Sequence, residues 1–314
     1  MKEPLLSICI PTYNRCNVLD DILGKMVCNQ EFDNSVEIII SDNCSTDNTE
    51  NVAMKYVAEH ANVFYYKNEE NINDANFIRV LNLAHGSYLK LLNDWCYLSN
   101  ESMAYVKEML KKHEADHTPV FFTNDWLFTK NRSEVMQCHN LDEYIQRVST
   151  FVTSIGIFGT WKRDWEQVKE KEKYLSYKLM QVDWTYQIAA NRGCVIYNRH
   201  IYGQSSAIEV HQRSGYNWFQ VHLDNYYKIM KPYCEKQMVS KKTQKNDRKY
   251  LLKHFTSELC QIYIQHRCKR WAYDTDGTTG YLLKYYHADL YFYYFMFTLP
   301  IKWATKRRIR HFTC

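Results

Sequence analysis

The sequence predicts an α/β protein whose mostly parallel, Rossmann-like sheet is flanked by helices, with a helical appendage at the C-terminal end. Two observations carry this prediction. Over the first 95 residues, short apolar runs such as 36–40 alternate with amphipathic helical segments, which is typical of a parallel sheet buried on both faces. From about residue 216 the strand-like runs give way to long amphipathic stretches.

The elements follow in order, and each type shares a recognisable pattern. The predicted strands are continuous apolar or β-branched runs, at 5–10, 36–40, 63–66, 87–92, 120–123, 151–158 and 194–197. The predicted helices have apolar residues at helical spacing, at 18–26, 50–59, 75–83, 102–113, 142–150, 181–190, 218–230, 247–269 and 281–299. Gly86 and Pro300 end two of them, and a lysine-rich connector precedes 247. We expect domains at 1–210 and 211–314.

Composition restricts the class of protein. The 314 residues carry a net charge of +5, with 26 Tyr, 14 Phe and 8 Trp. The eleven cysteines are scattered without a C-x-x-C pair, and no signal peptide opens the chain, so we expect a reduced, cytoplasmic protein. No apolar run reaches the roughly 18–20 residues that span a bilayer.

Several familiar sites are absent from the sequence. It contains no G-x-G-x-x-G or P-loop phosphate motif and no G-x-S-x-G nucleophile motif. His200, His211 and His222 are spaced too widely to be zinc ligands on one helix. No nucleic-acid-binding pattern accompanies the basic charge, so we expect no nucleic-acid partner.

Polar segments instead follow the predicted strands. Pro11-Thr-Tyr-Asn-Arg15 follows the first strand, Ser41-Asp-Asn-Cys-Ser-Thr-Asp47 the second, and Asn93-Asp94 the fourth. In open α/β sheets, ligands bind at the carboxyl ends of the strands. These segments therefore predict a binding site at one edge of the sheet.

The ordered set resembles the inverting family 2 glycosyltransferases with the GT-A fold. The three polar segments match, the last of them as Leu91-Leu92-Asn93-Asp94-Trp95. Two further matches are Asn71…Asn76…Arg79…Gly86, and Val182-Asp183-Trp184 followed by Asn191-Arg192-Gly193. The resemblance covers residues ~4 to ~200. It implies that 1–95 binds a nucleotide-sugar and that 96–210 forms the acceptor and catalytic half.

The resemblance implies a donor site for a nucleotide-sugar, UDP-linked by preference. Its residues would be Pro11, Thr12, Tyr13, Arg15, Asp42, Asn71, Arg79, Asn93, Asp94 and Trp95. Asp42 would hold the nucleobase, with an N-cap role as the alternative. Arg15 would face a phosphate, or else be an exposed helix-start charge. Trp95 would stack on a sugar or pack in the core, and the alternative role of the asparagines, Asn76 included, is to order turns.

Asp94 is also the expected metal ligand. Family members have an Asp-rich motif here that holds Mg²⁺ or Mn²⁺ against the diphosphate, whereas this chain retains a single carboxylate. The alternative is that Asp94 binds the ribose or the donor sugar and no metal is required.

Asp183 is the predicted catalytic base. It opens a predicted helix, where the macrodipole favours the ionised form, and it matches the family's base in context. A plain N-cap role is the alternative. Asp125 is a competing base, Asp164 a weaker one, and His200 could approach the diphosphate.

The last predicted helix is aromatic and is followed by a basic segment, Lys302 to Arg310. Such a helix suits a membrane surface, with an oligomer interface as the alternative. We therefore expect a transferase on the inner face of the membrane that extends a lipid-linked saccharide of capsule or O-antigen. The alternatives are a non-catalytic nucleotide-sugar or glycan-binding relative and a sugar nucleotidyltransferase.

Overall fold

The central sheet of the computed structural model is built around strand β1, which is buried along most of its length. The structure describes residues 3–125, 127, 133–207, 215–265 and 273–304. They divide into two compact units, Met1–Ile208 and Glu209–Cys314. Within the described ranges, no helix combines the length and the apolar character that crossing a bilayer requires.

The strands of the first unit form three sheets. Their bounds are β1 Leu6–Thr12, β2 Val36–Asp42, β3 Val63–Lys67, β4 Tyr88–Leu91, β5 Cys96–Leu98, β6 Val120–Phe122, β7 Val135–Cys138, β8 Gly159–Trp161, β9 Cys194–Tyr197 and β10 Tyr202–Gln204. The main sheet has the order β3-β2-β1-β4-β8, and only β8 runs antiparallel. The smaller sheets are β6-β9-β7 and β10-β5. The predicted mixed, mostly parallel sheet is confirmed.

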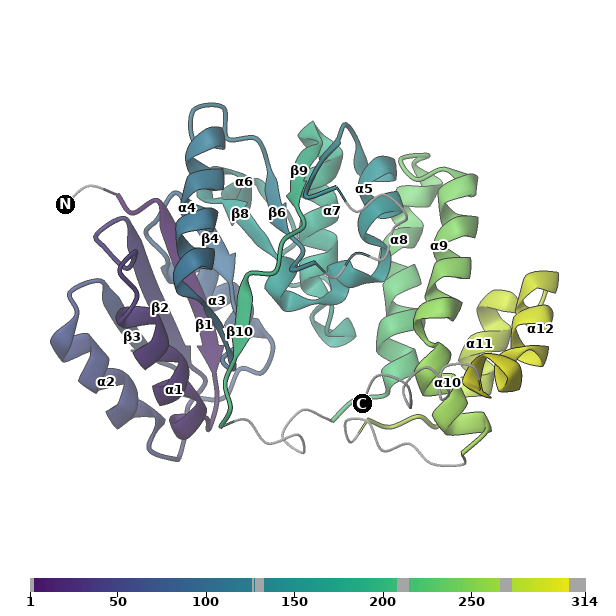
Figure 1. Ribbon diagram of the computed structural model, residues 1–314, viewed down its shortest axis with the longest axis horizontal. Helices are drawn as coiled ribbons and strands as arrows, with labels where there is room; N and C mark the ends of the chain where they lie inside the picture. Colours follow the sequence, from purple (N-terminus) through teal and green to yellow (C-terminus); the bar gives the residue numbers. More distant parts are fainter. Residues whose placement is uncertain (1–2, 126, 128–132, 208–214, 266–272, 305–314) are drawn as a thin grey trace. The chain divides into compact units, whose positions relative to one another are not determined.

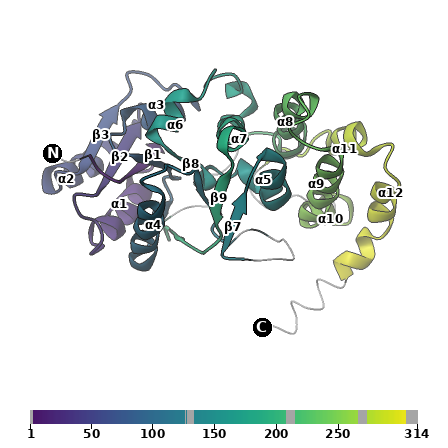
Figure 2. The ribbon, with the colours of Figure 1, turned by 90° about the horizontal axis from the view of Figure 1, so that it is seen from above.

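Helices cover both faces of the main sheet. The α-helices of this unit are α1 Cys16–Val27, α2 Thr49–Glu59, α3 Ala75–Leu83, α4 Asn100–His113, α5 Leu141–Val148, α6 Lys162–Gln167 and α7 Met180–Arg192. Seen from above, α1 and α4 lie on one side of the sheet and α3 and α6 on the other (Figure 2). The strands are therefore buried on both faces, which explains their continuous apolar sequences.

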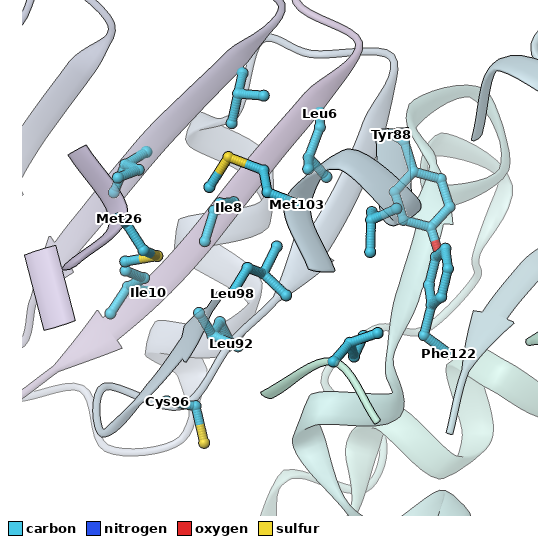
Figure 3. Packing of buried hydrophobic residues seen from close by; sticks show 14 of the residues in the cluster. Leu6, Ile8, Ile10, Met26, Tyr88, Leu92, Cys96, Leu98, Met103 and Phe122 are labelled. Carbon is cyan, nitrogen blue, oxygen red and sulfur yellow. The ribbon is translucent and has the colours of Figure 1, made fainter. Parts of the chain in front are cut away.

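The core of this unit is formed mainly by one face of β1 and the helices over it. Leu6, Ile8 and Ile10 are alternate residues of β1, and they lie on the side of the sheet where Met26 of α1 and Met103 of α4 pack (Figure 3). Alternate residues of a strand share a face, so these three side chains form one apolar row. This packing holds the carboxyl end of β1 at a fixed place.

One predicted strand is wrong. The segment 151–158 is not a strand: it forms two short 3₁₀ helices, η1 Ser149–Thr153 and η2 Ile155–Ile157, before β8. Backbone N–H groups pair with several of its carbonyls, and Nζ of Lys90 donates to the oxygens of Gly156 and Phe158. Its last residues, 156–158, are buried without belonging to a strand, so composition alone was misleading. The short elements β5, β7, β10, α6 and η3 Leu175–Tyr177 also had no counterpart in the prediction.

The second unit is helical, as predicted, but its helices are shorter and more numerous. They are the π-helical turn η5 Gln220–Asn225, α8 Tyr226–Glu235, α9 Lys241–His254, α10 Thr256–Tyr263, α11 Thr278–Tyr286 and α12 Leu290–Phe297, labelled in Figure 1 where space allows. The lysine-rich stretch is not a connector, because Ser240 caps α9 at its start. The predicted helix 281–299 is broken before Asp289, whose side chain caps α12.

Candidate functional site

Parallel pairing brings the ends of three strands to one edge of the main sheet. β1 lies between β2 and β4, and Thr12 at its end is the register partner of Asp42 at the end of β2. Beyond the end of β4, the backbone N–H of Leu92 donates to the carbonyl oxygen of Cys9 at 2.9 Å, which carries the pairing up to Asn93 and Asp94. Residues predicted from three separate segments therefore lie at one edge.

Asp94 is in direct contact with two of the predicted residues. The hydroxyl of Thr12 donates to Oδ2 of Asp94 at 3.2 Å, and Nε of Arg15 lies 3.7 Å from the same oxygen. The Asp94 and Arg15 side chains are each 16% exposed. Burial raises the pKa of Asp94, while the nearby guanidinium acts in the opposite direction. The three residues form a half-buried corner in which a cation and a carboxylate face the strand ends.

Asp42 is completely buried, and both of its carboxylate oxygens have donors. Oδ1 accepts from the backbone N–H of Ser45 at 2.9 Å and from its hydroxyl at 2.5 Å, and Oδ2 accepts from the hydroxyl of Tyr65 at 2.7 Å. Asp42 does not cap α2, because the N-cap position belongs to Asn48. Its carboxylate is thus held in one orientation, and the sequence carried no signal for the contribution of Tyr65.

The loop after β1 is fastened to the loop after β2. The backbone N–H of Asn14 donates to Oγ of Ser45 at 2.8 Å, and Oδ1 of Asn14 accepts from the N–H of Thr46 at 2.8 Å. Asn14 has a φ of 51°, in the left-handed region that asparagine tolerates well. Tyr13 is 43% exposed beside this loop. Its exposed ring, one residue after the end of β1, offers an apolar face to a ligand.

The predicted asparagines order the neighbouring turn. Nδ2 of Asn43 donates to Oδ1 of Asn71 at 2.9 Å, and Nδ2 of Asn76 donates to the carbonyl oxygen of Ser41 at 2.8 Å. Asn71 therefore takes part in joining this turn to the β2 loop. Arg79 is exposed on α3, outside this network.

Asn93 and Trp95 flank Asp94 and are both partly buried. Trp95 packs against the hydrophobic core, and its carbonyl oxygen accepts from the backbone N–H of Ser205 at 2.8 Å, just beyond β10. Pro11 is partly buried near the end of β1. These positions surround the Asp94 corner with backbone and apolar surface.

Asp183 lies in the first turn of α7, and only 5% of it is exposed. It is not the N-cap, which is Leu179. Nε2 of Gln187, one turn further along, donates to Oδ2 of Asp183 at 2.8 Å, and its side-chain oxygen accepts from the backbone N–H of Lys169 at 3.0 Å. The charge of Asp183 is one of the causes that raise the pKa of Tyr174. Gln187 therefore fixes a buried carboxylate near the positive end of a helix.

The competing acids have other surroundings. Asp164 is buried and bonded to the guanidinium of Arg192 at 2.7 Å, so its charge is already compensated. Asp125 is exposed and makes one long contact, 3.4 Å from Nδ2 of Asn198. His200 is exposed after β9. Asp164 is thus paired with a cation, and Asp125 and His200 are exposed, whereas Asp183 is buried at the start of a helix.

Asp94 is the one predicted ligand for a divalent ion at this site. Within the described ranges, no group of three or more His, Cys, Asp and Glu side chains is arranged to hold a metal. Asp94 supplies a hard carboxylate oxygen, and Asn93 supplies an amide oxygen next to it in sequence. These residues suit an ion that also takes ligands from a bound diphosphate, and not a metal held by the protein alone.

Comparison with known proteins agrees with this arrangement. The family model "Glycosyl transferase family 2" matches residues 7–175, more than half of the chain. The abequosyltransferase RfbV of Salmonella typhimurium is 34% identical over 108 residues, covering 34% of this chain and 32% of that protein. An uncharacterized glycosyltransferase of Mycoplasma genitalium, MG060, is 28% identical over 115 residues, or 35% of this chain and 39% of that protein. The chain thus matches about a third of the length of these relatives.

The fold has known counterparts as well. S. aureus TarS 1–349, solved in complex with UDP, superposes with a TM-score of 0.55 at 14% identity, covering 83% of this chain and 75% of that one. A second structure of S. aureus TarS gives a TM-score of 0.54 at 15% identity, over 83% of this chain and 46% of that one. The sheet order and the flanking helices are accordingly GT-A-like. By its family-model match over most of the first unit, the chain belongs to glycosyl transferase family 2.

Proposed function

We propose that the protein is an inverting glycosyltransferase that moves a sugar from a nucleoside-diphosphate sugar to a hydroxyl of a saccharide. The observation that carries the proposal is the half-buried corner of Thr12, Arg15 and Asp94 at the strand ends. A fixed cation beside a carboxylate at this edge can receive a diphosphate and the group attached to it. The donor would be a UDP-sugar, with Asp42 and the exposed ring of Tyr13 at the nucleoside.

The second half of the chemistry belongs to Asp183. In this proposal its carboxylate takes the proton of the acceptor hydroxyl as that oxygen attacks the anomeric carbon. The bond from that carbon to the diphosphate breaks, and Arg15 balances part of the charge left on the nucleoside diphosphate. Attack opposite the departing group inverts the anomeric configuration. Gln187 keeps the carboxylate oriented through its 2.8 Å hydrogen bond.

Glycosyltransferases of this family commonly use a divalent metal. In this protein Asp94, next to Asn93, would be its ligand. When bound, Mg²⁺ or Mn²⁺ would supply positive charge to the departing diphosphate.

The acceptor, we propose, is a lipid-linked saccharide of a surface polysaccharide such as capsule or O-antigen. The similarity to an abequosyltransferase supports a saccharide acceptor. The surface of α12 supports the lipid. Leu290, Tyr294 and Phe297 of α12, and Ile301 just beyond it, are all more than 60% exposed. The three in α12 recur at helical spacing.

The opposite side of α12 is buried within the second unit, through Phe292 and Phe295. Over residues 290–304 the sequence has a single charged side chain, Lys302. An exposed apolar stripe with a cationic end is suited to the surface of an anionic bilayer. The basic residues 306–310, which support the same proposal by composition, lie outside the described residues. The protein would then work as a peripheral protein on the cytoplasmic face of the membrane.

A donor screen tests the proposed reaction. The full chain is mixed with UDP-, GDP-, CDP- and dTDP-sugars, and binding is followed by thermal shift. Release of nucleoside diphosphate is then measured with a saccharide acceptor, with Asp183→Asn as the control. We expect one nucleotide class to stabilise the protein and to be consumed only by the unmodified chain. Binding without turnover would favour a non-catalytic relative, and absence of binding to every donor would overturn the proposal.

Vesicle sedimentation tests the membrane surface. We expect the chain to sediment with phosphatidylglycerol-containing vesicles and less with phosphatidylcholine alone. The double variant Leu290→Ser/Phe297→Ser should remain in solution, whereas Met54→Ser/Val135→Ser, at exposed apolar positions of the first unit, should sediment normally. If the stripe variant instead changes only the mass in light scattering, the stripe joins two copies of the chain and the membrane proposal is wrong.

A further inference from the structure

A lysine is completely buried inside the first unit. Lys90 is in β4 with no accessible surface. Its Nζ donates to the carbonyl oxygen of Phe158 at 2.9 Å and to that of Gly156, and it lies 5.6 Å from the centre of the Tyr202 ring. Among the ion pairs of the described residues, none includes Lys90. Among the described residues, the ammonium therefore has carbonyl oxygens and an aromatic face beside it and no carboxylate partner.

This arrangement costs the fold free energy, because the desolvated ammonium has no carboxylate to compensate it. Burial lowers the pKa of Lys90 to about 7. The two carbonyls do not depend on the lysine for a donor. Gly156 also accepts from the hydroxyl of Tyr202 at 2.5 Å, and Phe158 from the backbone N–H of Leu91 at 3.2 Å. A methionine would fill the same volume without leaving either carbonyl unpaired.

The position of Lys90 explains what the ammonium can contribute. Lys90 is in β4, three residues before Asn93 and four before Asp94, which follow the end of this strand at the sheet edge. Gly156 belongs to η2, which directly follows η1. The carbonyl oxygen of Thr153, in η1, accepts from Nε2 of Gln181 at 2.8 Å, and Gln181 is in the first turn of α7 with Asp183.

We infer that Lys90 is a positioning residue for transfer, which ties the strand bearing Asp94 to the η1–η2 segment that braces the first turn of α7 and thus Asp183. This inference rests on the proposed function. Lys90 touches neither predicted carboxylate, so it acts through the backbone that it holds. The connection runs from β4 through Gly156 and Thr153 to Gln181, each step being a direct hydrogen bond or a few residues of chain. The lysine thereby sets how the donor corner and the base face one substrate.

The test compares Lys90→Met with a second buried lysine. Lys107 is 5% exposed but is paired with Glu31 and Asp33 at 3.0 and 2.9 Å, away from the strand-end corner. Four quantities are measured for each variant: the thermal midpoint, the dissociation constant of UDP or the active nucleotide, kcat, and backbone hydrogen exchange. We expect Lys90→Met to have a thermal midpoint no lower than that of the unmodified chain and a nucleotide dissociation constant within twofold of it. Its kcat should fall at least tenfold. Lys107→Met should lose thermal stability and keep its kcat per folded molecule.

Hydrogen exchange separates this inference from the proposed function, because it needs no turnover. Amides of residues 149–158 and of the first turn of α7 should exchange faster in Lys90→Met, while those of β1 and β2 should not change. Tyr202→Phe, which removes the other side-chain donor on Gly156, should move the same amides in the same direction.

Two results would overturn the positioning role: unchanged exchange in residues 149–158, or a Lys90→Met chain that fails to fold. Faster exchange at these residues in a protein whose unmodified form transfers no sugar would overturn the proposed function alone.

Discussion

The carboxylate of Asp94 lies 3.7 Å from Nε of Arg15, and the two side chains are buried to the same extent. Arg15 follows β1 and Asp94 follows β4, which pair in parallel, so the pairing of the strands brings the two charges together. Thr12 completes the contact by donating to the same carboxylate oxygen. This corner is the point from which the proposed donor site can be tested.

Asp94→Asn should make the protein more stable near neutral pH and much less active. Burial raises the pKa of Asp94, so the folded protein holds that proton more tightly than the unfolded chain does. Ionisation of Asp94 therefore removes stability as the pH rises through the raised pKa, and the loss persists at pH 7. The asparagine does not ionise, and its amide can still accept from Thr12.

Thermal unfolding of both proteins from pH 3 to pH 7 checks this prediction. The midpoint of Asp94→Asn relative to the unmodified chain should rise toward neutral pH, and transfer should fall about 100-fold. A variant that is less stable at pH 7, or that transfers at the normal rate, would contradict the role of Asp94.

Asp183→Asn should lower kcat by about 1,000-fold, the range for loss of a general base, and leave the nucleotide dissociation constant unchanged. Gln187→Leu should lower kcat by less. It removes the 2.8 Å hydrogen bond that orients the Asp183 carboxylate, but the carboxylate remains as the base.

Two competing acids serve as controls for Asp183. Asp164→Asn breaks the ion pair with Arg192 and should reduce stability while the rate per folded molecule is retained. Asp125→Asn, at an exposed site, should change neither. If Asp125→Asn abolished transfer and Asp183→Asn did not, the base would have been assigned to the wrong residue.

Tyr65→Phe should weaken nucleotide binding several-fold and cost about 2 kcal/mol of unfolding free energy, since a buried carboxylate loses a donor. The tyrosine hydroxyl donates to Oδ2 of Asp42 at 2.7 Å. The measurement is calorimetric binding of UDP together with urea unfolding. Tyr66→Phe, at the next position of β3, is the matched control and should remain within about 0.5 kcal/mol of the unmodified chain. Equal effects of the two changes would argue against Asp42 as a base-binding residue.

Binding of Mn²⁺ should require the nucleotide. Asp94 is the one carboxylate predicted at the diphosphate, and the described residues offer no cluster of three ligands. Calorimetry should therefore detect Mn²⁺ binding in the presence of UDP and none in its absence. Asn93→Asp adds a second hard oxygen ligand and should raise the affinity about tenfold. Tight binding of Mn²⁺ to the nucleotide-free protein would show that other residues hold the ion.

The elements that could be predicted were those buried on both sides or amphipathic over several turns. β1, β2 and α3 have such patterns, and the sequence located them closely. The predicted helix 281–299 is divided by a capping aspartate at 289, because the backbone N–H of Tyr291 pairs with that side chain. Pro300 does not end it as predicted, because residues 299–304 are helical again. Elements of three or four residues, such as β5 and β7, are too short for periodicity to show.

The candidate site divides in the same way. The sequence alone determined which polar segments follow the strands, because packing of the strands between helices imposes an apolar pattern that ends at the edge of the sheet. Its resemblance to the family also implied Asp42, Asp94 and Asp183 as the acids of the site. Only the tertiary structure decided what each acid touches: Tyr65 on Asp42, Arg15 on Asp94, and Gln187 on Asp183.

Lys90 shows the reason most clearly. In the sequence it is one lysine within an apolar run, and nothing there indicates that its ammonium is buried. Its partners, Gly156 and Phe158, are more than sixty residues away, in a segment whose composition suggested a strand. Apolar patterning records the burial of a residue's own element, whereas a hydrogen bond between distant segments leaves no periodic trace in either one.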